Sequence, residues 1–172
     1  MRRQVPLAAL LLATAVATLG CYESDFPMGP PSTAIDPHLL GKWRCVLAVG
    51  STTQSLDLAV ARRGDQQYDL TLDMPGEDTG HYRGHPTDVH GTTIVNLQEL
   101  KAGQDPGAGR WDFVRATLLR PNVLDVEVVD DALFKGKPAT AEGQRAVLDA
   151  SIGRPELFAD YCVCARVVPD KN

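Results

Sequence analysis

Residues 43–49 read Trp43-Arg44-Cys45-Val46-Leu47-Ala48-Val49, and residues 161–168 read Tyr161-Cys162-Val163-Cys164-Ala165-Arg166-Val167-Val168. Both runs are typical of β-strands and stand near the two ends of the predicted domain. If they pair antiparallel, one register places Trp43 opposite Arg166 and Cys45 opposite Cys164. An indole beside a guanidinium and a thiol opposite a thiol are favourable cross-strand pairs. The sequence therefore predicts that the first and last strands lie side by side.

Between these runs, apolar and polar residues alternate with a period of two, which predicts further strands with one buried face. The strands cover residues 56–61, 68–74, 92–97, 111–119 and 124–128, with a short candidate at residues 80–84. Short connections rich in Gly, Pro, Asn and Asp favour consecutive hairpins. A helix that Thr140 can cap and Gly153 can end precedes the last strand. Because closure removes exposed sheet edges, we expect a mainly β fold, a single antiparallel up-and-down β-barrel of about eight strands.

The start of the first strand carries a family resemblance. Gly41-Lys42-Trp43 resembles the Gly-x-Trp motif of lipocalins and related calycins, and Arg166 matches in place the Arg that packs over that Trp. The resemblance implies a lipocalin-like barrel that binds a small apolar ligand inside. The candidate lining residues, each of which has plain core as its alternative, are Leu58, Leu70, Leu72, Val95, Val126 and Val128.

The first 20 residues have the pattern of an export signal. Arg2 and Arg3 precede an uncharged apolar run of about 15 residues, shorter than the roughly 20 that span a membrane. Gly20-Cys21 resembles the lipobox of bacterial lipoproteins, which implies cleavage before Cys21, acylation of that residue and a membrane anchor. In that family, an Asp directly after the lipidated Cys commonly retains the protein at the inner membrane. Position 22 is Tyr, which favours the outer membrane. An ordinary export signal beside a coincidental Cys is the alternative.

We therefore expect four regions: a signal peptide at residues 1–20, the lipidated Cys21 with a Pro-rich tether at residues 21–38, the barrel at residues 39–168 and a tail at residues 169–172. The mature 152 residues suffice for one domain. Without Arg2 and Arg3, 15 of the 17 basic residues remain against 22 acidic ones, a formal charge near −7. Nucleic acid is therefore not an expected partner.

The remaining cysteines are expected to form a disulfide after export. Cys162 and Cys164 lie on the same side of one strand, which is poor geometry for a bond between them. Cys45 is therefore expected to pair with Cys164, with Cys162 as the diagonal alternative. Three thiols around a metal ion are a further interpretation, although the usual Cys-x-x-Cys spacing is missing.

Three histidines, His81, His85 and His90, lie within ten residues and can bind zinc or copper if the chain gathers them. Gly84 and Pro86 disfavour a regular strand here, so a loop is expected. Solvent-exposed histidines in a polar turn region are the simpler interpretation.

The sequence holds no Gly-x-Ser-x-Gly, His-Glu-x-x-His, phosphate-loop or dinucleotide motif. We therefore expect a protein without enzymatic activity or cofactor, anchored in the cell envelope and binding a small apolar ligand. The alternatives are a filled barrel whose loops at residues 75–91 and 100–109 contact an envelope protein, and a metal-handling protein that uses the histidines. An apolar cavity would favour ligand binding, and a packed interior would favour the interaction module.

Overall fold

The computed structural model describes residues 21–49, 52–101, 103, 109–134, 136 and 138–168. The predicted signal peptide at residues 1–20 and the tail at residues 169–172 lie outside the described residues. The strands are β1 (Glu23–Ser24), β2 (Gly41–Val49), β3 (Thr52–Arg63), β4 (Gln67–Asp73), β5 (Gly80–Val89), β6 (Thr92–Glu99), β7 (Trp111–Arg120), β8 (Val123–Val129) and β9 (Phe158–Arg166). The helical elements are η1 (Pro37–Leu39), η2 (Asp131–Phe134), α1 (Ala141–Ser151) and η3 (Pro155–Leu157).

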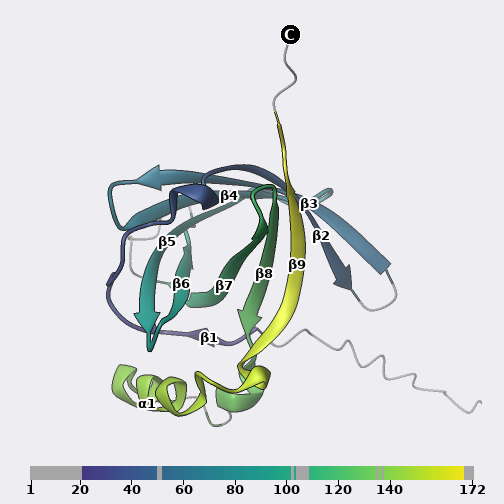
Figure 1. Ribbon diagram of the computed structural model, residues 1–172. Coiled ribbons are helices and arrows are strands. Elements are labelled where there is room, and N and C mark those ends of the chain that lie inside the picture. Colours follow the sequence, from purple (N-terminus) through teal and green to yellow (C-terminus); the bar gives the residue numbers. More distant parts are fainter. Residues whose placement is uncertain are drawn as a thin grey trace, which may run out of the picture.

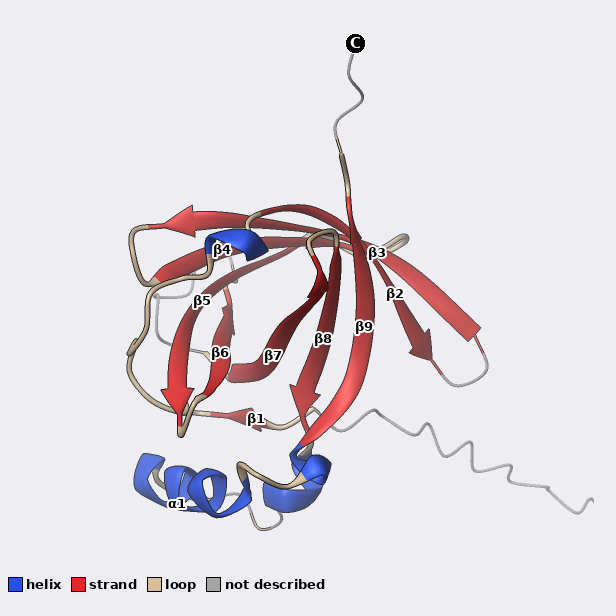
Figure 2. Cartoon of the chain, viewed as in Figure 1, coloured by secondary structure: helices blue, strands red, loops and turns tan. Residues whose placement is uncertain are grey.

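Strands β2 to β9 form a closed antiparallel barrel (Figures 1 and 2). Each strand pairs with the next one along the chain, and β2 pairs with β9 to close the sheet. The up-and-down topology predicted from the short connections is confirmed, as is the helix before the last strand. Thr140 caps that helix, because its hydroxyl accepts a hydrogen bond from the Gly143 amide at 3.1 Å.

The predicted register between the first and last strands is confirmed. Trp43 lies opposite Arg166 and Cys45 opposite Cys164. The Arg166 guanidinium stands 4.1 Å from the centre of the fully buried Trp43 ring, within cation–π range. A disulfide joins Cys45 to Cys164 across a sequence separation of 119 residues. Both ends of the barrel chain are therefore held together by a covalent bond and a stacked cation.

Arg166 also closes one end of the barrel through backbone contacts. Its guanidinium donates hydrogen bonds to the carbonyl oxygens of Leu40 at 2.7 Å and Pro121 at 3.3 Å, and to that of His38. These carbonyls belong to the entry of β2 and to the turn between β7 and β8. Gly41 has a φ of 129°, and a Cβ there would lie 2.8 Å from the guanidinium. Glycine at this position therefore makes room for the arginine.

We expect Arg166→Met to lower the free energy of unfolding by about 2 kcal/mol, because the cation over Trp43 is lost and the carbonyls of Leu40, Pro121 and His38 lose their donor. Urea denaturation with the disulfide intact measures this change. Arg120→Met, at an exposed position on the same end of the barrel, is the control and should change stability by less than about 0.5 kcal/mol. Equal losses in the two variants would contradict the role of Arg166.

A second core lies outside the barrel, between its lower wall and α1 (Figure 1). Its buried members come from the chain after Cys21, from four strands and from the helical segment, and they are Tyr22, Met28, Val89, Ile94, Phe113, Val129, Phe134, Leu148 and Leu157. Tyr22 stacks on Phe134 with ring centres 4.0 Å apart. The helix therefore covers a wall of the barrel and does not fill its interior.

Strand β5 corrects the expectation of a loop through residues 75–91, because it continues through Gly84 and Pro86 to Val89. β4 pairs with β5 only as far as Gly84, so Pro86 faces an edge that needs no amide donor from it. At Gly84 a Cβ would lie 2.7 Å from the Leu97 side chain, which explains the glycine. The end of the β4 pairing before Pro86 and the close Leu97 side chain at Gly84 thus allow both residues in a strand.

The expected tether packs against the barrel instead of extending from it. Residues 22–36, here called the N-terminal strap, pass between the barrel and α1 and then along the outer wall to η1 (Figure 1). Tyr22, Met28 and Ile35 are at most 4% exposed. β1, within the strap, pairs with β7 in the register Glu23 to Asp112. Residues 22–36 of the expected Pro-rich tether are therefore packed as part of the domain.

Polar residues on the outer wall explain why the strap is held. The fully buried Asn96 side chain accepts a hydrogen bond from the Met28 amide at 2.7 Å and donates to the Thr87 hydroxyl at 3.0 Å. The Thr87 hydroxyl in turn donates to the carbonyl of Pro30, and the His85 ring bonds the carbonyl of Gly29 at 2.9 Å. A Pro-rich segment cannot pair fully with a sheet, so side chains satisfy its backbone.

Asn96→Ala is expected to cost about 2–3 kcal/mol of stability, because it leaves the buried Met28 amide and Thr87 hydroxyl without this partner. Amide exchange at Met28 should speed up more than amide exchange in β2. Chemical denaturation and hydrogen exchange measure the two effects, with the exposed Gln54→Ala as control. Unchanged exchange at Met28 would show that Asn96 does not hold the strap.

Candidate functional site

The barrel encloses a cavity of about 630 Å³. Its wall is mostly apolar and is built from the inward-facing residues of β3 to β9. All six residues named from the sequence lie in this wall: Leu58, Leu70, Leu72, Val95, Val126 and Val128. They come together because inward positions alternate along each strand and neighbouring strands keep these positions in register.

The two ends of the cavity differ in exposure. At the end closed by Arg166, the lining residues Leu39, Tyr68 and Leu124 are at most 9% exposed. At the other end the lining residues are only partly buried or exposed. This end, here called the mouth, is formed by Cys21, Glu23, Met74, Tyr82, Asp112 and Asp131. The cavity therefore runs from an apolar closed end to a mouth that carries three carboxylates.

Asp112 is the carboxylate with the most perturbed environment at the mouth. It lies on β7 between Leu97 of β6 and Glu23 of β1. Burial, followed by the nearby carboxylates of Glu23 and Glu99, raises the pKa of Asp112 from 3.8 to about 6. Glu23 itself forms an ion pair with Arg110 at 2.7 Å. Asp112 is thus held among carboxylates at the edge of an apolar chamber, where a cation or a hydrogen-bond donor would stabilise its charge.

Asp112→Asn is expected to raise the melting temperature by a few degrees at pH 8 and to leave it unchanged at pH 3.5. An acid whose pKa is higher in the folded state destabilises that state once it ionises, so stability falls as pH rises from about 4 through about 6. Thermal unfolding at several pH values measures the difference.

Asp57→Asn is the control for this series, because Arg44 lowers the pKa of Asp57 and the variant should lose a little stability at pH 8. A gain for Asp112→Asn that persists at pH 3.5 would contradict the assignment.

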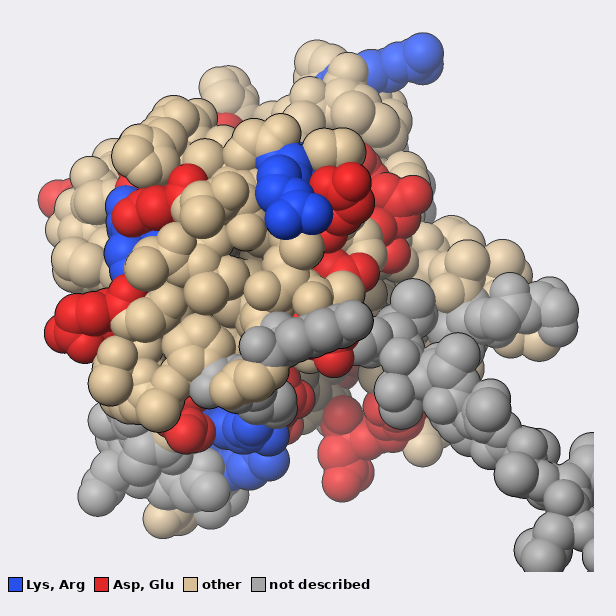
Figure 3. All heavy atoms as spheres, turned by 90° about the horizontal axis from the view of Figure 1, so that it is seen from below, with Lys and Arg blue, Asp and Glu red and all other residues tan. Residues whose placement is uncertain are grey.

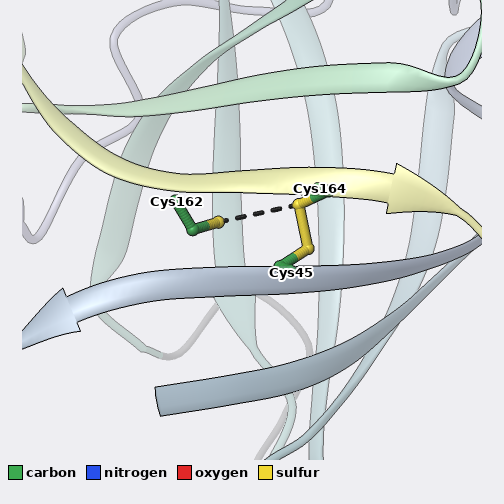
Figure 4. Close-up of side chains that lie close together, drawn as sticks. All are labelled: Cys45, Cys162 and Cys164. Carbon is green, nitrogen blue, oxygen red and sulfur yellow. Dashed lines mark hydrogen bonds between the residues drawn. A yellow bond between two sulfur atoms is a disulfide. The ribbon is translucent and has the colours of Figure 1, made fainter. Parts of the chain in front are cut away.

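The three cysteines after Cys21 lie together on the inner wall (Figure 4). Cys45 and Cys164 form the disulfide, and the Cys162 sulfur lies 3.7 Å from that of Cys164. The sulfur atoms of all three lie within 4.8 Å of one another. Burial raises the pKa of the Cys162 thiol to about 12, so it stays protonated and weakly reactive at neutral pH. With two sulfurs joined, one thiol remains, which is too few for a three-thiolate metal site.

The structure does not bring the three histidines together as a metal site. His81 and His85 lie on β5, and the His85 ring is buried against the strap. His90 has a φ of 51° in the turn after β5, and its ring lies 3.2 Å from Asp149 of α1. Within the described part of the chain, only the cysteine group has three metal-binding side chains close together.

Sequence reasoning missed the polar members of the mouth. Asp112 shares its side of β7 with Val114 and Ala116, so the alternation along the strand placed it inside. Tyr82 follows the same rule on β5. Cys21 carried no such signal, because its place at the mouth depends on its antiparallel bridge to Asp130. A parity count would have found the first two residues, and only the tertiary structure places the third.

No protein-family model, curated protein or solved structure matches this chain. Within the described residues, no helix is both long and apolar enough to cross a bilayer. Seen from below, Lys and Arg side chains are scattered among Asp and Glu side chains (Figure 3).

Proposed function

We propose that this chain is an exported bacterial lipoprotein, anchored through Cys21 in the outer membrane, whose lipocalin-like barrel binds a small apolar ligand. The cavity carries this proposal. Its volume of about 630 Å³ lies within the range of roughly 300–1,000 Å³ common for small-molecule sites. Its wall is apolar, and a few polar groups stand at one end, as in sites that bury a ligand body and orient one group.

The binding mechanism would be burial of apolar surface. A ligand that leaves water for this chamber gains about 25 cal/mol for each Å² of apolar surface that it buries. The disulfide, the Arg166 contacts and the paired strands keep the wall in place before the ligand arrives, so little ordering is needed on binding. No side chain needs to react for this function.

Ala116→Phe is expected to weaken binding of a neutral apolar fluorescent probe such as N-phenyl-1-naphthylamine by at least about tenfold. Ala116 lines the cavity, so the added ring occupies the space of the ligand. Probe titration of the mature chain, residues 21–172, measures the affinity, because this chain contains the whole described fold. Ala165→Phe, on an exposed position of β9, is the control with the same added ring.

The result that would overturn ligand binding is equal affinity in both variants and the unaltered chain, with melting temperatures that show all three folded. Mass measurement of the protein from a bacterial membrane tests the anchor separately. An unprocessed chain, or one without acyl groups on Cys21, would overturn that part of the proposal.

The second candidate is an interaction module, and one surface observation favours it. Val46 of β2 and Val163 of β9 lie opposite each other across the closing strands, and each is 50% exposed. Two adjacent exposed valines on one wall could contact an envelope partner. The patch is small and the interior is not filled, so ligand binding is the better supported function.

A further inference from the structure

The cavity and the proposed anchor meet at one place. Cys21 lines the mouth, forms an antiparallel bridge with Asp130 and is partly buried. Asp112 and Glu23 line the same mouth, so the Cys21 side chain lies among these carboxylates. Acyl groups on the Cys21 sulfur would therefore begin at the rim of the cavity.

The chain is packed against the domain directly after Cys21. The Tyr22 amide donates a hydrogen bond to the Val129 carbonyl at 2.9 Å, and the Tyr22 ring, 2% exposed, stacks on Phe134 and Phe113. β1 follows at once and pairs with β7. Because the strap is packed from its first residue, the anchor cannot hold the barrel away from a membrane. Acyl chains in a bilayer would instead bring the mouth to the membrane surface.

The chemistry of the cavity indicates the kind of ligand that fits this orientation. The apolar interior suits one hydrocarbon chain, and the closed end at Leu39 and Tyr68 sets the limit of its depth. The head group would remain at the mouth beside Glu23, Asp112 and Asp131. Carboxylates repel an anionic head group and attract an ammonium group or a hydroxyl donor.

We propose that acylated Cys21 holds the mouth against the bilayer, so that the cavity takes a single-chain amphiphile with an uncharged or cationic head group directly from the membrane. This inference rests on the proposed function and adds the source and the class of the ligand. When the mouth contacts the membrane, a hydrocarbon chain can pass from the bilayer into the cavity without entering water. When the mouth lies at a distance from the membrane, every methylene of that chain must cross water. Contact therefore speeds loading of long chains without changing affinity.

The test compares the acylated protein in phosphatidylcholine vesicles with a spaced variant. That variant carries Cys21→Ser, and its acylated cysteine stands at the outer end of an inserted Gly/Ser linker of about 20 residues, with a reach of about 25 Å. Two dansyl-labelled alkyl amines serve as probes: a long-chain amine that resides in the membrane and a short-chain amine that dissolves in water. Energy transfer from the tryptophans reports loading, and Ala116→Phe in each background gives the signal that does not come from the cavity.

We expect the linker to slow loading of the long-chain amine by at least about tenfold and to leave the short-chain amine unchanged. A matched long-chain carboxylate should bind more weakly than the amine. Equal loading rates with and without the linker would overturn the membrane-facing mouth while leaving ligand binding intact. Loading that Ala116→Phe does not reduce would instead overturn the proposed function, and a mature chain without acyl groups would overturn the inference through its anchor.

Discussion

The structure depends on the pairing of β2 with β9. An antiparallel ribbon of eight strands leaves two open edges unless its ends meet, and here they meet in one register. Arg166 over Trp43 and the Cys45–Cys164 disulfide are both products of that register. If the ends parted, the wall would lose its curvature and the cavity would become a groove. Closure is therefore the condition for every functional statement about the interior.

The cavity exists because of how large and small side chains are distributed over the closed wall. An eight-stranded barrel is just wide enough either to be filled by its own side chains or to hold one small ligand. In this barrel Leu, Val and Ala occupy most of the inward positions at mid-height. The Trp43 indole lies at the closed end, and Phe134 lies in the second core outside the wall. The bulky rings thus stabilise the ends and outside of the barrel and leave space at its centre.

The N-terminal strap connects the barrel with Cys21, which the sequence analysis interprets as a lipid anchor. Its proline content excludes helix and full strand pairing, and the buried polar residues Asn96, Thr87 and His85 supply the partners that its backbone needs. A Pro-rich segment with the composition of a spacer can therefore pack against a barrel when side chains of the barrel wall supply hydrogen-bond partners for its backbone. The mouth of the cavity and Cys21 are held in one rigid arrangement as a result.

The sequence by itself determined most of the barrel strands, their order, the helix, the closing register and the six apolar lining residues. These features follow from local alternation, turn chemistry and the complementary residues of the two terminal strands, which need no knowledge of the rest of the fold. Only the tertiary structure decided the course of residues 22–36, the continuation of β5 through Pro86, the separation of the histidines and the place of Cys21 at the mouth. Each of these depends on contacts between segments far apart in the chain, because a polar residue such as Asn96 has the same pattern whether it faces water or a strap.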